Sequence, residues 1–252
     1  MRRAAPIAVL VLTLAAPAAA FAAARQPVPT KQRIESIKRY LRARQGINAF
    51  AVMTSRGHLR GYAQNRTYAS ASVVKAMLLV AYLRKIRARG ASPEERGLLA
   101  PMITRSHNRA ASAIYARLGD GPLYDLARRA RMRQFSVAGY WSSARISAAD
   151  QARFMKRFLR LTPRRTRSYA RRLLSSIVSR QRWGFSRYSL DAGWNTFFKG
   201  GWIQTGAGDL VHEVALFERG RRRFSVAVLT DGNPSFGYGI ATLRGVAARL
   251  FE

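Results

Sequence analysis

The stretch from Ala69 to Val80 opens a helix and carries a single lysine among apolar side chains. Ser72 and Lys75 lie three residues apart in it, so in a helix Ser72 Oγ and Lys75 Nζ share one face and can meet. The surrounding Val, Met and Leu side chains predict that the amine is buried, because a helix this apolar packs into a core. Burial lowers the pKa of a lysine from about 10.4, and a neutral amine can activate a serine hydroxyl. The other interpretation is an exposed serine that happens to lie near a lysine.

Lysine usage supports the first interpretation. Of the 45 cationic side chains only six are lysine, so arginine serves almost wherever a surface cation is sufficient. Arginine keeps its proton in proteins, whereas lysine can act as a base. Lys75 and Lys199 are therefore candidates for chemistry. The other four lie in amphipathic patterns and are expected to be solvated: Lys31, Lys38, Lys85 and Lys156.

The first residues predict export. Met1-Arg2-Arg3 is followed by an apolar run from Ala4 to Ala20 and by small residues, the pattern of a secretory signal peptide. Cleavage is expected between Ala20 and Arg25. We therefore divide the chain into a signal peptide, residues 1–24, and one mature domain, residues 25–252, and expect a secreted, periplasmic or envelope location in a bacterium.

Cysteine is absent, which excludes a lipoprotein attachment site and a disulfide framework. No other apolar run approaches the roughly 20 residues that span a bilayer, so no transmembrane anchor is expected after cleavage. A formal net charge of +33 would usually suggest nucleic acid. The basic residues are spread over nearly every segment and the chain is exported, so we expect no nucleic-acid partner. Anionic cell-envelope polymer is the better partner, and an arginine bias without any partner is the alternative.

Hydrophobic periodicity predicts helices at both ends and in the middle of the chain, with strands near each end. Caps at Thr30, Ser92 and Ser147 mark three helix starts, the last a variant of the capping box with Asp150. Helices are expected at residues 30–44, from the Ser72 stretch to 88, at 92–104, 107–119, 121–132, 147–161, 164–179 and 238–251. Strands are expected at residues 47–54, 59–63, 194–204, 210–218 and 223–230.

Two further motifs follow the serine–lysine pair. Ser106-His107-Asn108 lies between two predicted helices, and Lys199-Gly200-Gly201 lies in the first of the three C-terminal strands. Each has a structural interpretation when taken alone. Ser106 is then a helix N-cap, and the glycine pair is an irregularity of the strand.

Their order is informative. S-x-x-K at a helix start, S-x-N in a loop and K-x-G on a strand form the motif set of the penicillin-recognising serine enzymes, and this sequence resembles the class A β-lactamases and DD-peptidases over nearly the whole mature chain. The resemblance implies an α+β fold. An antiparallel five-stranded sheet comes from the N- and C-terminal segments and is flanked by helices, and a cleft separates it from an all-helical subdomain.

The resemblance also implies an acyl transfer that needs no metal and no cofactor. Ser72 would attack a carbonyl and become acylated, while Lys75 takes its proton directly or through water. The backbone N–H groups of Ser72 and Trp202 would form the oxyanion hole.

The second and third motifs complete the implied site. Ser106 would pass a proton to the leaving nitrogen, and Asn108 would hydrogen-bond Lys75 or a substrate amide. Lys199 would keep the field positive, and Gly200 and Gly201 would lie against the substrate.

The sequence departs from the family at several positions. Gly200 stands where a hydroxyl residue usually binds the substrate carboxylate, and His107 replaces the usual aspartate. Class A enzymes carry a deacylating glutamate roughly 36 residues after the serine of the second motif, and here that count reaches Trp141 to Ser143. The nearest carboxylate, Asp150, is better explained by a helix start. We therefore expect slow deacylation, as in a DD-peptidase.

Other kinds of site have little support. His58, His107 and His212 are scattered, and His212-Glu213 lacks the second histidine of H-E-x-x-H, so no metal site is expected. His212 or Glu213 could reach the cleft beside Lys199, but a satisfied strand or surface residue is the preferred interpretation of each.

The sequence therefore predicts an exported serine hydrolase that forms an acyl-enzyme on Ser72 with amides of the β-lactam or D-alanyl peptide kind. The expected partners are a β-lactam or a peptidoglycan-derived peptide. The alternative is a non-catalytic envelope-binding protein that keeps the fold.

Overall fold

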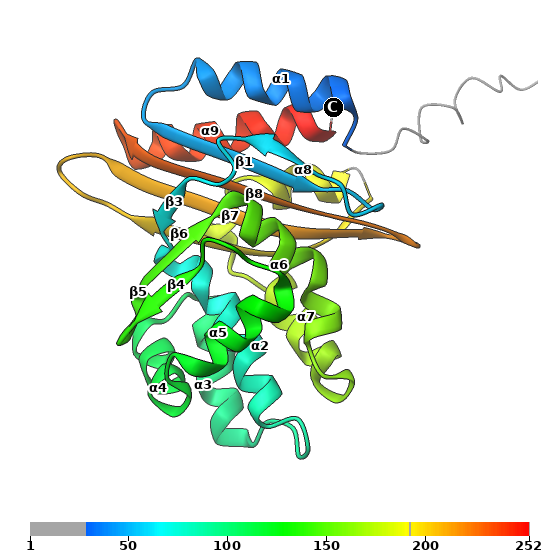
Figure 1. The fold of residues 1–252 in the computed structure, drawn as a ribbon, viewed down its shortest axis with the longest axis vertical. Coiled ribbons are helices and arrows are strands. Elements are labelled where there is room, and N and C mark those ends of the chain that lie inside the picture. The colour runs from blue at the N-terminus through cyan, green and yellow to red at the C-terminus, as the bar shows by residue number, and fades with distance from the viewer. Residues whose placement is uncertain (1–28, 192, 252) are drawn as a thin grey trace, which may run out of the picture.

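Strands from both ends of the chain meet in one antiparallel sheet. The computed structural model describes residues 29–191 and 193–251. The strands are β1 (Ile47–Met53), β2 (Leu59–Tyr62), β6 (Asn195–Ile203), β7 (Asp209–Arg219) and β8 (Arg222–Asn233). Their order in the sheet is β2-β1-β8-β7-β6 (Figure 1). The N-terminal strand β1 thus pairs with the C-terminal strand β8, and the predicted five-stranded antiparallel sheet is confirmed.

One face of this sheet is covered by the first and last helices, which lie side by side in Figure 1. They are α1 (Lys31–Arg42) and α9 (Phe236–Phe251). Thr30 caps α1, because its side chain accepts a hydrogen bond from Arg33 N at 3.2 Å. The short helix α8 (Phe185–Asp191) packs against α9 and was not predicted.

The other face carries the helical part of the molecule (Figure 1). Helix α6 (Ala148–Leu161) lies directly on β1, β7 and β8 and presents its buried side chains to them. In the described part of the chain, no helix is both long and apolar enough to cross a membrane. The remaining elements are α2 (Lys75–Lys85), α3 (Pro93–Thr104), α4 (Asn108–Leu118), α5 (Gly121–Ala130) and α7 (Arg167–Ser175), with 3₁₀ turns η3 (Ala71–Val74), η4 (Arg164–Thr166) and η5 (Ser179–Gln181).

A second, three-stranded sheet interrupts the helices, and the prediction of a wholly helical middle is wrong there. It contains β3 (Thr67–Ala69), β4 (Ser136–Ala138) and β5 (Tyr140–Ser147), in the order β3-β5-β4. Buried and exposed positions do not alternate strictly along β5, so its sequence lacks the period of two that identifies a strand. β5 pairs with distant β3, which leaves no local signal, and with its chain neighbour β4 across Gly139, a hairpin that the sequence analysis does not predict.

Two helices end before the predicted residue. Residues 86–89 form turns, so α2 ends at Lys85 although Gly90, the expected stop, has a φ of +80°. Helix α7 ends at Ser175, four residues early. After α2, Arg87 and Arg89 are good helix formers and extend the helical pattern beyond the true end. After α7, Ile177 lies three residues beyond Leu174 and continues the helical spacing of apolar residues. The predicted signal peptide, residues 1–24, lies outside the described residues.

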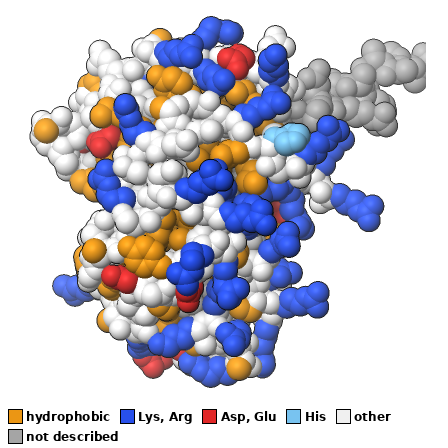
Figure 2. Space-filling model, in the orientation of Figure 1, with side chains coloured by type: hydrophobic (Ala, Val, Ile, Leu, Met, Phe, Trp, Pro, Cys, Tyr) orange, Lys and Arg blue, Asp and Glu red, His pale blue; other side chains and the backbone are white. Residues whose placement is uncertain are grey.

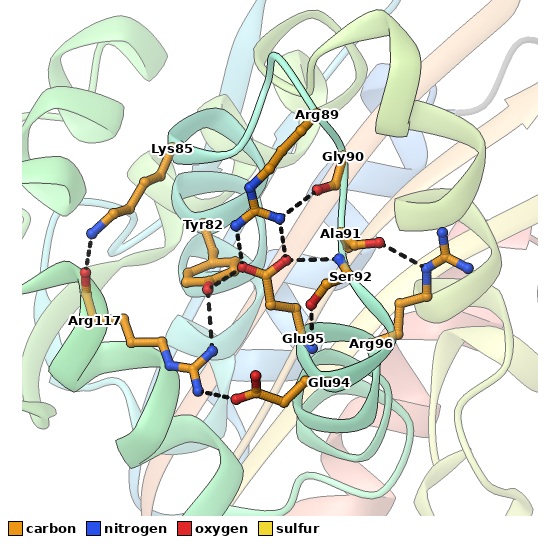
Figure 3. Close-up of polar contacts among 10 residues, drawn as sticks. All are labelled: Tyr82, Lys85, Arg89, Gly90, Ala91, Ser92, Glu94, Glu95, Arg96 and Arg117. Carbon is orange, nitrogen blue, oxygen red and sulfur yellow. Dashed lines mark hydrogen bonds and ion pairs between the residues drawn. The ribbon is translucent and has the colours of Figure 1, made fainter.

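A buried carboxylate fixes the turn between α2 and α3 (Figure 3). Glu95 is 4% exposed and forms a capping box with Ser92, whose N–H it accepts at 2.8 Å. It also accepts hydrogen bonds from Tyr82 Oη at 2.7 Å and from both terminal nitrogens of Arg89. The Arg89 guanidinium holds the pKa of the Glu95 carboxyl well below its usual range. Helix α2 is thereby fixed at the end opposite Lys75.

Candidate active site

Ser72 and Lys75 meet as the sequence predicts. Ser72 lies in η3 and Lys75 is the first residue of α2, so one continuous turn carries both side chains. Lys75 Nζ lies 2.9 Å from Ser72 Oγ. Lys75 is fully buried, whereas Ser72 is only half-buried. The hydroxyl can therefore be reached from solvent while the amine behind it cannot.

The amine of Lys75 has two further strong partners. It donates to Ser106 O at 2.6 Å and to Asn108 Oδ1 at 2.7 Å, and Ser106 Oγ lies 3.3 Å away. Burial lowers the pKa of Lys75 to about 7. A neutral amine has two N–H bonds and one lone pair, so the two oxygens can take the hydrogens and leave the lone pair for the Ser72 hydroxyl.

The loop of the second motif is held in an unusual backbone conformation. Ser106 has a φ of +59°, in the left-handed region. Its interpretation as an N-cap is wrong, because His107 caps α4 and accepts the Ala110 N–H at Nδ1 over 3.2 Å. His107 N also donates to Pro101 O at 3.1 Å. The loop thus turns both Ser106 and Asn108 toward Lys75.

Lys199 reaches the same serine from the sheet. Its Nζ donates to Ser106 Oγ at 3.1 Å and to Gly200 O at 2.8 Å. Lys199 is fully buried, and burial together with the nearby Lys75 amine lowers its pKa well below the usual value. Ser106 Oγ therefore bridges the amines of Lys75 and Lys199, and the three motifs converge on one hydroxyl.

The two glycines of the third motif permit close packing on opposite faces of β6. A Cβ at position 201 would lie 2.9 Å from Ser72 N, so only glycine lets the strand approach the turn that carries Ser72. A Cβ at position 200 would lie 3.2 Å from Trp183 Cζ3. The Trp183 ring packs edge-on against Trp202, with ring centres 5.0 Å apart. An aromatic cluster thus lies where a side chain at position 200 would project.

Trp141 is a neighbour of the amine that the sequence patterns do not predict. The indole of Trp141 on β5 faces Lys75, with Nζ 4.7 Å from the ring centre, and it donates through Nε1 to Ser112 Oγ at 3.1 Å. Trp141 is 5% exposed. Trp141 does lie about 36 residues after Ser106, where related enzymes carry a glutamate, but the sequence shows there only that a carboxylate is lacking. The contact itself requires the second sheet, which was not predicted.

His212 is a buried and satisfied strand residue, as the preferred interpretation holds, whereas Glu213 is buried with its Oε1 left without a hydrogen-bond partner among the described residues. His212 accepts Thr230 N at Nδ1, so its Nε2 carries the hydrogen that contacts Ala69 O at 3.0 Å. Burial lowers the pKa of His212 to about 4. Glu213 accepts Phe185 N at 3.1 Å, and burial raises the pKa of its carboxyl to about 7.

Asp150 does not complete a capping box. Ser147 caps α6 by accepting Asp150 N at 3.2 Å, but the Asp150 carboxylate instead accepts the backbone N–H groups of Arg133 and Gln134, at 2.9 and 2.6 Å, and pairs with Arg153. The side chain therefore fixes the loop before β4. It is fully engaged away from Ser72.

Comparisons with known proteins agree with this architecture. A sequence profile described as the beta-lactamase enzyme family matches residues 90–252, which include the second and third motifs. No curated protein matches the chain. Similar solved structures include a beta-lactamase from Sphaerobacter thermophilus, with a TM-score of 0.75 and 16% identity over 87% of this chain and 96% of that chain.

Two further solved structures have the same arrangement of elements. The TLA-1 extended-spectrum beta-lactamase gives a TM-score of 0.74 and 12% identity over 88% of this chain and 98% of its own. A beta-lactamase from Xanthomonas campestris pv. campestris gives a TM-score of 0.69 and 16% identity over 88% of this chain and 96% of its own. At these identities the likeness establishes the α+β fold.

Proposed function

This chain belongs to the beta-lactamase enzyme family, and we propose that it is an exported serine hydrolase that forms an acyl-enzyme on Ser72. The proposed substrates are amides of the β-lactam or D-alanyl peptide kind. One observation carries the proposal: a buried amine with a pKa near 7, Lys75, lies 2.9 Å from a half-buried serine hydroxyl. Covalent catalysis needs a nucleophile within hydrogen-bond reach of a base whose pKa lies near the working pH, and this pair meets both conditions.

Acylation would proceed by a direct proton transfer. The neutral amine of Lys75 takes the hydroxyl proton as Ser72 Oγ attacks the carbonyl carbon. The negative charge moves to the carbonyl oxygen, which the backbone N–H groups of Ser72 and Trp202 would stabilise. The close approach of Gly201 to Ser72 N supports this assignment, because it brings β6 against the turn that carries the first of these two amides. Loss of one such donor typically costs about 3 kcal/mol of transition-state stabilisation.

Collapse of the tetrahedral intermediate needs a proton on the leaving nitrogen. We assign this step to Ser106, whose Oγ lies 3.3 Å from Lys75 Nζ and 3.1 Å from Lys199 Nζ. The C–N bond breaks, the nitrogen takes the Ser106 proton, and the Lys75 ammonium returns a proton to Ser106. Asn108 would keep the amine oriented throughout, and Lys199 would assist as a second donor to Ser106.

Hydrolysis of the acyl-enzyme needs a base for the incoming water, and we propose that this step is slow. The Trp141 ring, not a carboxylate, faces Lys75 at the expected point of the chain. Both carboxylate oxygens of Asp150 are bound to backbone amides, and Glu213 accepts one backbone amide through Oε2. The lack of a general base typically lowers the rate of a step by a factor of about 10² to 10⁴. The proposed activity is therefore closer to that of a DD-peptidase than to rapid β-lactam hydrolysis.

A fluorescent penicillin tests the proposal. The mature protein, its Ser72→Ala variant and a Ser55→Ala control at an exposed serine are incubated with the probe and digested for mass spectrometry. We expect an adduct on the peptide that contains Ser72 in the wild type and in the control, and none in Ser72→Ala. Labelling that survives in Ser72→Ala, or no reaction with either a penicillin or a D-alanyl thioester, would refute it.

A further inference from the structure

A cavity far along α2 from Ser72 is lined almost entirely by arginine. It has a volume of about 430 Å³ and lies where the end of α2, the end of α5 and helix α6 come together. Its lining residues are Arg84, Arg129, Arg131, Arg157, Arg160 and Leu161.

These five guanidinium groups are not neutralised by the protein. None of them forms an ion pair with a carboxylate among residues 29–191 and 193–251, and Asp125, the acidic residue that acts on Arg84, is itself paired with Arg128. Burial and neighbouring guanidinium groups lower the pKa values of Arg84 and Arg157. Arginine stays protonated even so, so the cavity concentrates positive charge that repels itself.

A second basic cavity continues the first. It has a volume of about 330 Å³, and Arg157 and Arg160 line both. The second cavity adds Lys156, Arg221 and Arg223, of which Arg223 is paired with the buried Glu218. Figure 2 shows Lys and Arg side chains following one another over the helical part of this face, with few acidic side chains between them. The two cavities thus form one track rather than a single pocket.

We propose that this track binds a linear polyanion that carries closely spaced phosphate groups. Guanidinium groups bind phosphate oxygens through two parallel hydrogen bonds, and Arg157 and Arg160, which line both cavities, can link the phosphates bound in one to those bound in the other. A lone anion would occupy one cavity and leave the repulsion in the other. The track contains none of the residues placed around Ser72, so this binding is separate from the proposed hydrolase activity.

Arginine-rich composition alone does not account for the track. Exposed arginines such as Arg39 and Arg42 stand on the outer surface of α1, where water screens each one. Arg84 and Arg157, by contrast, are partly buried and line a shared concavity, where backbone carbonyls accept a hydrogen bond from each but no carboxylate neutralises its charge. Bringing cations together in this way costs free energy unless an anion joins them.

Binding to long-chain inorganic polyphosphate tests the proposal, with orthophosphate as the single-anion probe. The double variant Arg157→Gln/Arg160→Gln removes the shared arginines, and Arg39→Gln/Arg42→Gln is a control with the same change in net charge. We expect polyphosphate affinity to fall about tenfold or more in the first variant and by less than about twofold in the control. The slope of log affinity against log salt should fall by about 1 to 2 in the first variant alone.

Arg129→Gln/Arg131→Gln, at two exposed residues, must weaken polyphosphate binding as well, which keeps the test valid if the first variant fails to fold. Equal losses in the control would mean that only net charge matters, and would overturn the proposal. So would orthophosphate binding as tightly as polyphosphate, which would indicate a site for a single anion.

Discussion

The Nζ of Lys75 lies 4.7 Å from the centre of the Trp141 ring. The amine therefore has oxygens of Ser72, Ser106 and Asn108 within hydrogen-bond distance and an aromatic face on another side. An aromatic face attracts the ammonium form less than a carboxylate does, so the pKa of Lys75 stays close to the value that burial sets.

This relationship predicts a long-lived acyl-enzyme. Stopped-flow mixing with a penicillin should give a burst of one equivalent, and mass spectrometry at later times should find the adduct on Ser72 for minutes or longer. The physical reason is the proposed lack of a base for the incoming water, because a general base typically raises the rate of such a step by about 10² to 10⁴. Rapid steady-state hydrolysis would contradict this prediction, and the search for a base would then turn to Asp150, His107, His212 and Glu213.

Replacing Lys75 by arginine should abolish acylation. The guanidinium keeps the charge but cannot give up its proton, so Ser72 loses its base. Lys85→Arg, at an exposed lysine, is the matched control and should acylate at the wild-type rate. The readout is the burst amplitude with a fluorescent penicillin. A Lys75→Arg protein that still labels Ser72 would exclude Lys75 as the base.

Acylation should depend on pH through Lys75. The pKa of this amine is about 7, so its neutral form grows from a minor to the major species between pH 6 and 8. The acylation rate constant should rise over this range and then level off. A rate that falls as the pH rises through 7 would show that the ammonium form is the active one.

Stability should change in the same direction. An unfolded chain holds the Lys75 proton up to about pH 10.4, whereas the folded chain releases it near 7, so the unfolded state binds more protons in between. The Lys75 contribution to the free energy of unfolding therefore rises with pH between about 7 and 10. Lys75→Met should lack this part of the slope in urea titrations, and an unchanged slope would contradict the shifted pKa.

Glu95→Gln should destabilise the fold, whereas Glu94→Gln should not. Glu95 is buried and accepts charged hydrogen bonds from Arg89, so its loss should cost about 2 kcal/mol or more of unfolding free energy. Glu94 pairs with Arg117 but its side chain is 74% exposed, and such pairs contribute about 0 to 1 kcal/mol. The pKa of Glu95 is lower in the folded protein than in the unfolded chain, where it is about 4.3. The Glu95 contribution to the free energy of unfolding is therefore fully present above about pH 4.3 and decreases as the pH falls below that value. Equal effects of the two variants in chemical denaturation would contradict the assignment.

Gly200→Thr should not simply restore the hydroxyl that related enzymes carry there. A Cβ at this position lies 3.2 Å from Trp183 Cζ3, so the larger side chain must displace the indole, at a cost of about 1 to 3 kcal/mol. Gly206→Thr is the control, because nothing lies within 4 Å of a Cβ there. Thermal unfolding of both variants checks this, and a Gly200→Thr protein as stable as the control would show that Trp183 moves aside freely.

Much of the fold could be predicted because its signals are local. The caps at Thr30, Ser92 and Ser147 each accept the expected backbone N–H, at 3.2 Å in all three cases. The burial of Lys75 followed from the apolar side chains of its own helix. Such features depend on neighbours within one or two turns, which the sequence displays directly.

The features that sequence analysis missed depend on contacts between distant segments. Strand β5 pairs with distant β3 on one side and with its chain neighbour β4 on the other, and Trp141, which faces Lys75, lies on this strand. Asp150 was assigned to a capping box, but it bonds backbone amides of the preceding loop. The Trp183 ring over Gly200 is likewise brought there by tertiary packing. No periodicity or spacing in the chain reports these approaches.

The cap of α4 bears on how relatives of this chain can be found in sequence collections. His107 stands where the family usually carries aspartate, yet its Nδ1 accepts the Ala110 N–H as an aspartate oxygen does at an N-cap. What the fold requires at this position is an acceptor in the first turn, not a negative charge. A search string that fixes the letters S-D-N passes over such chains, whereas one that fixes the serine and asparagine and admits any capping acceptor between them retrieves them.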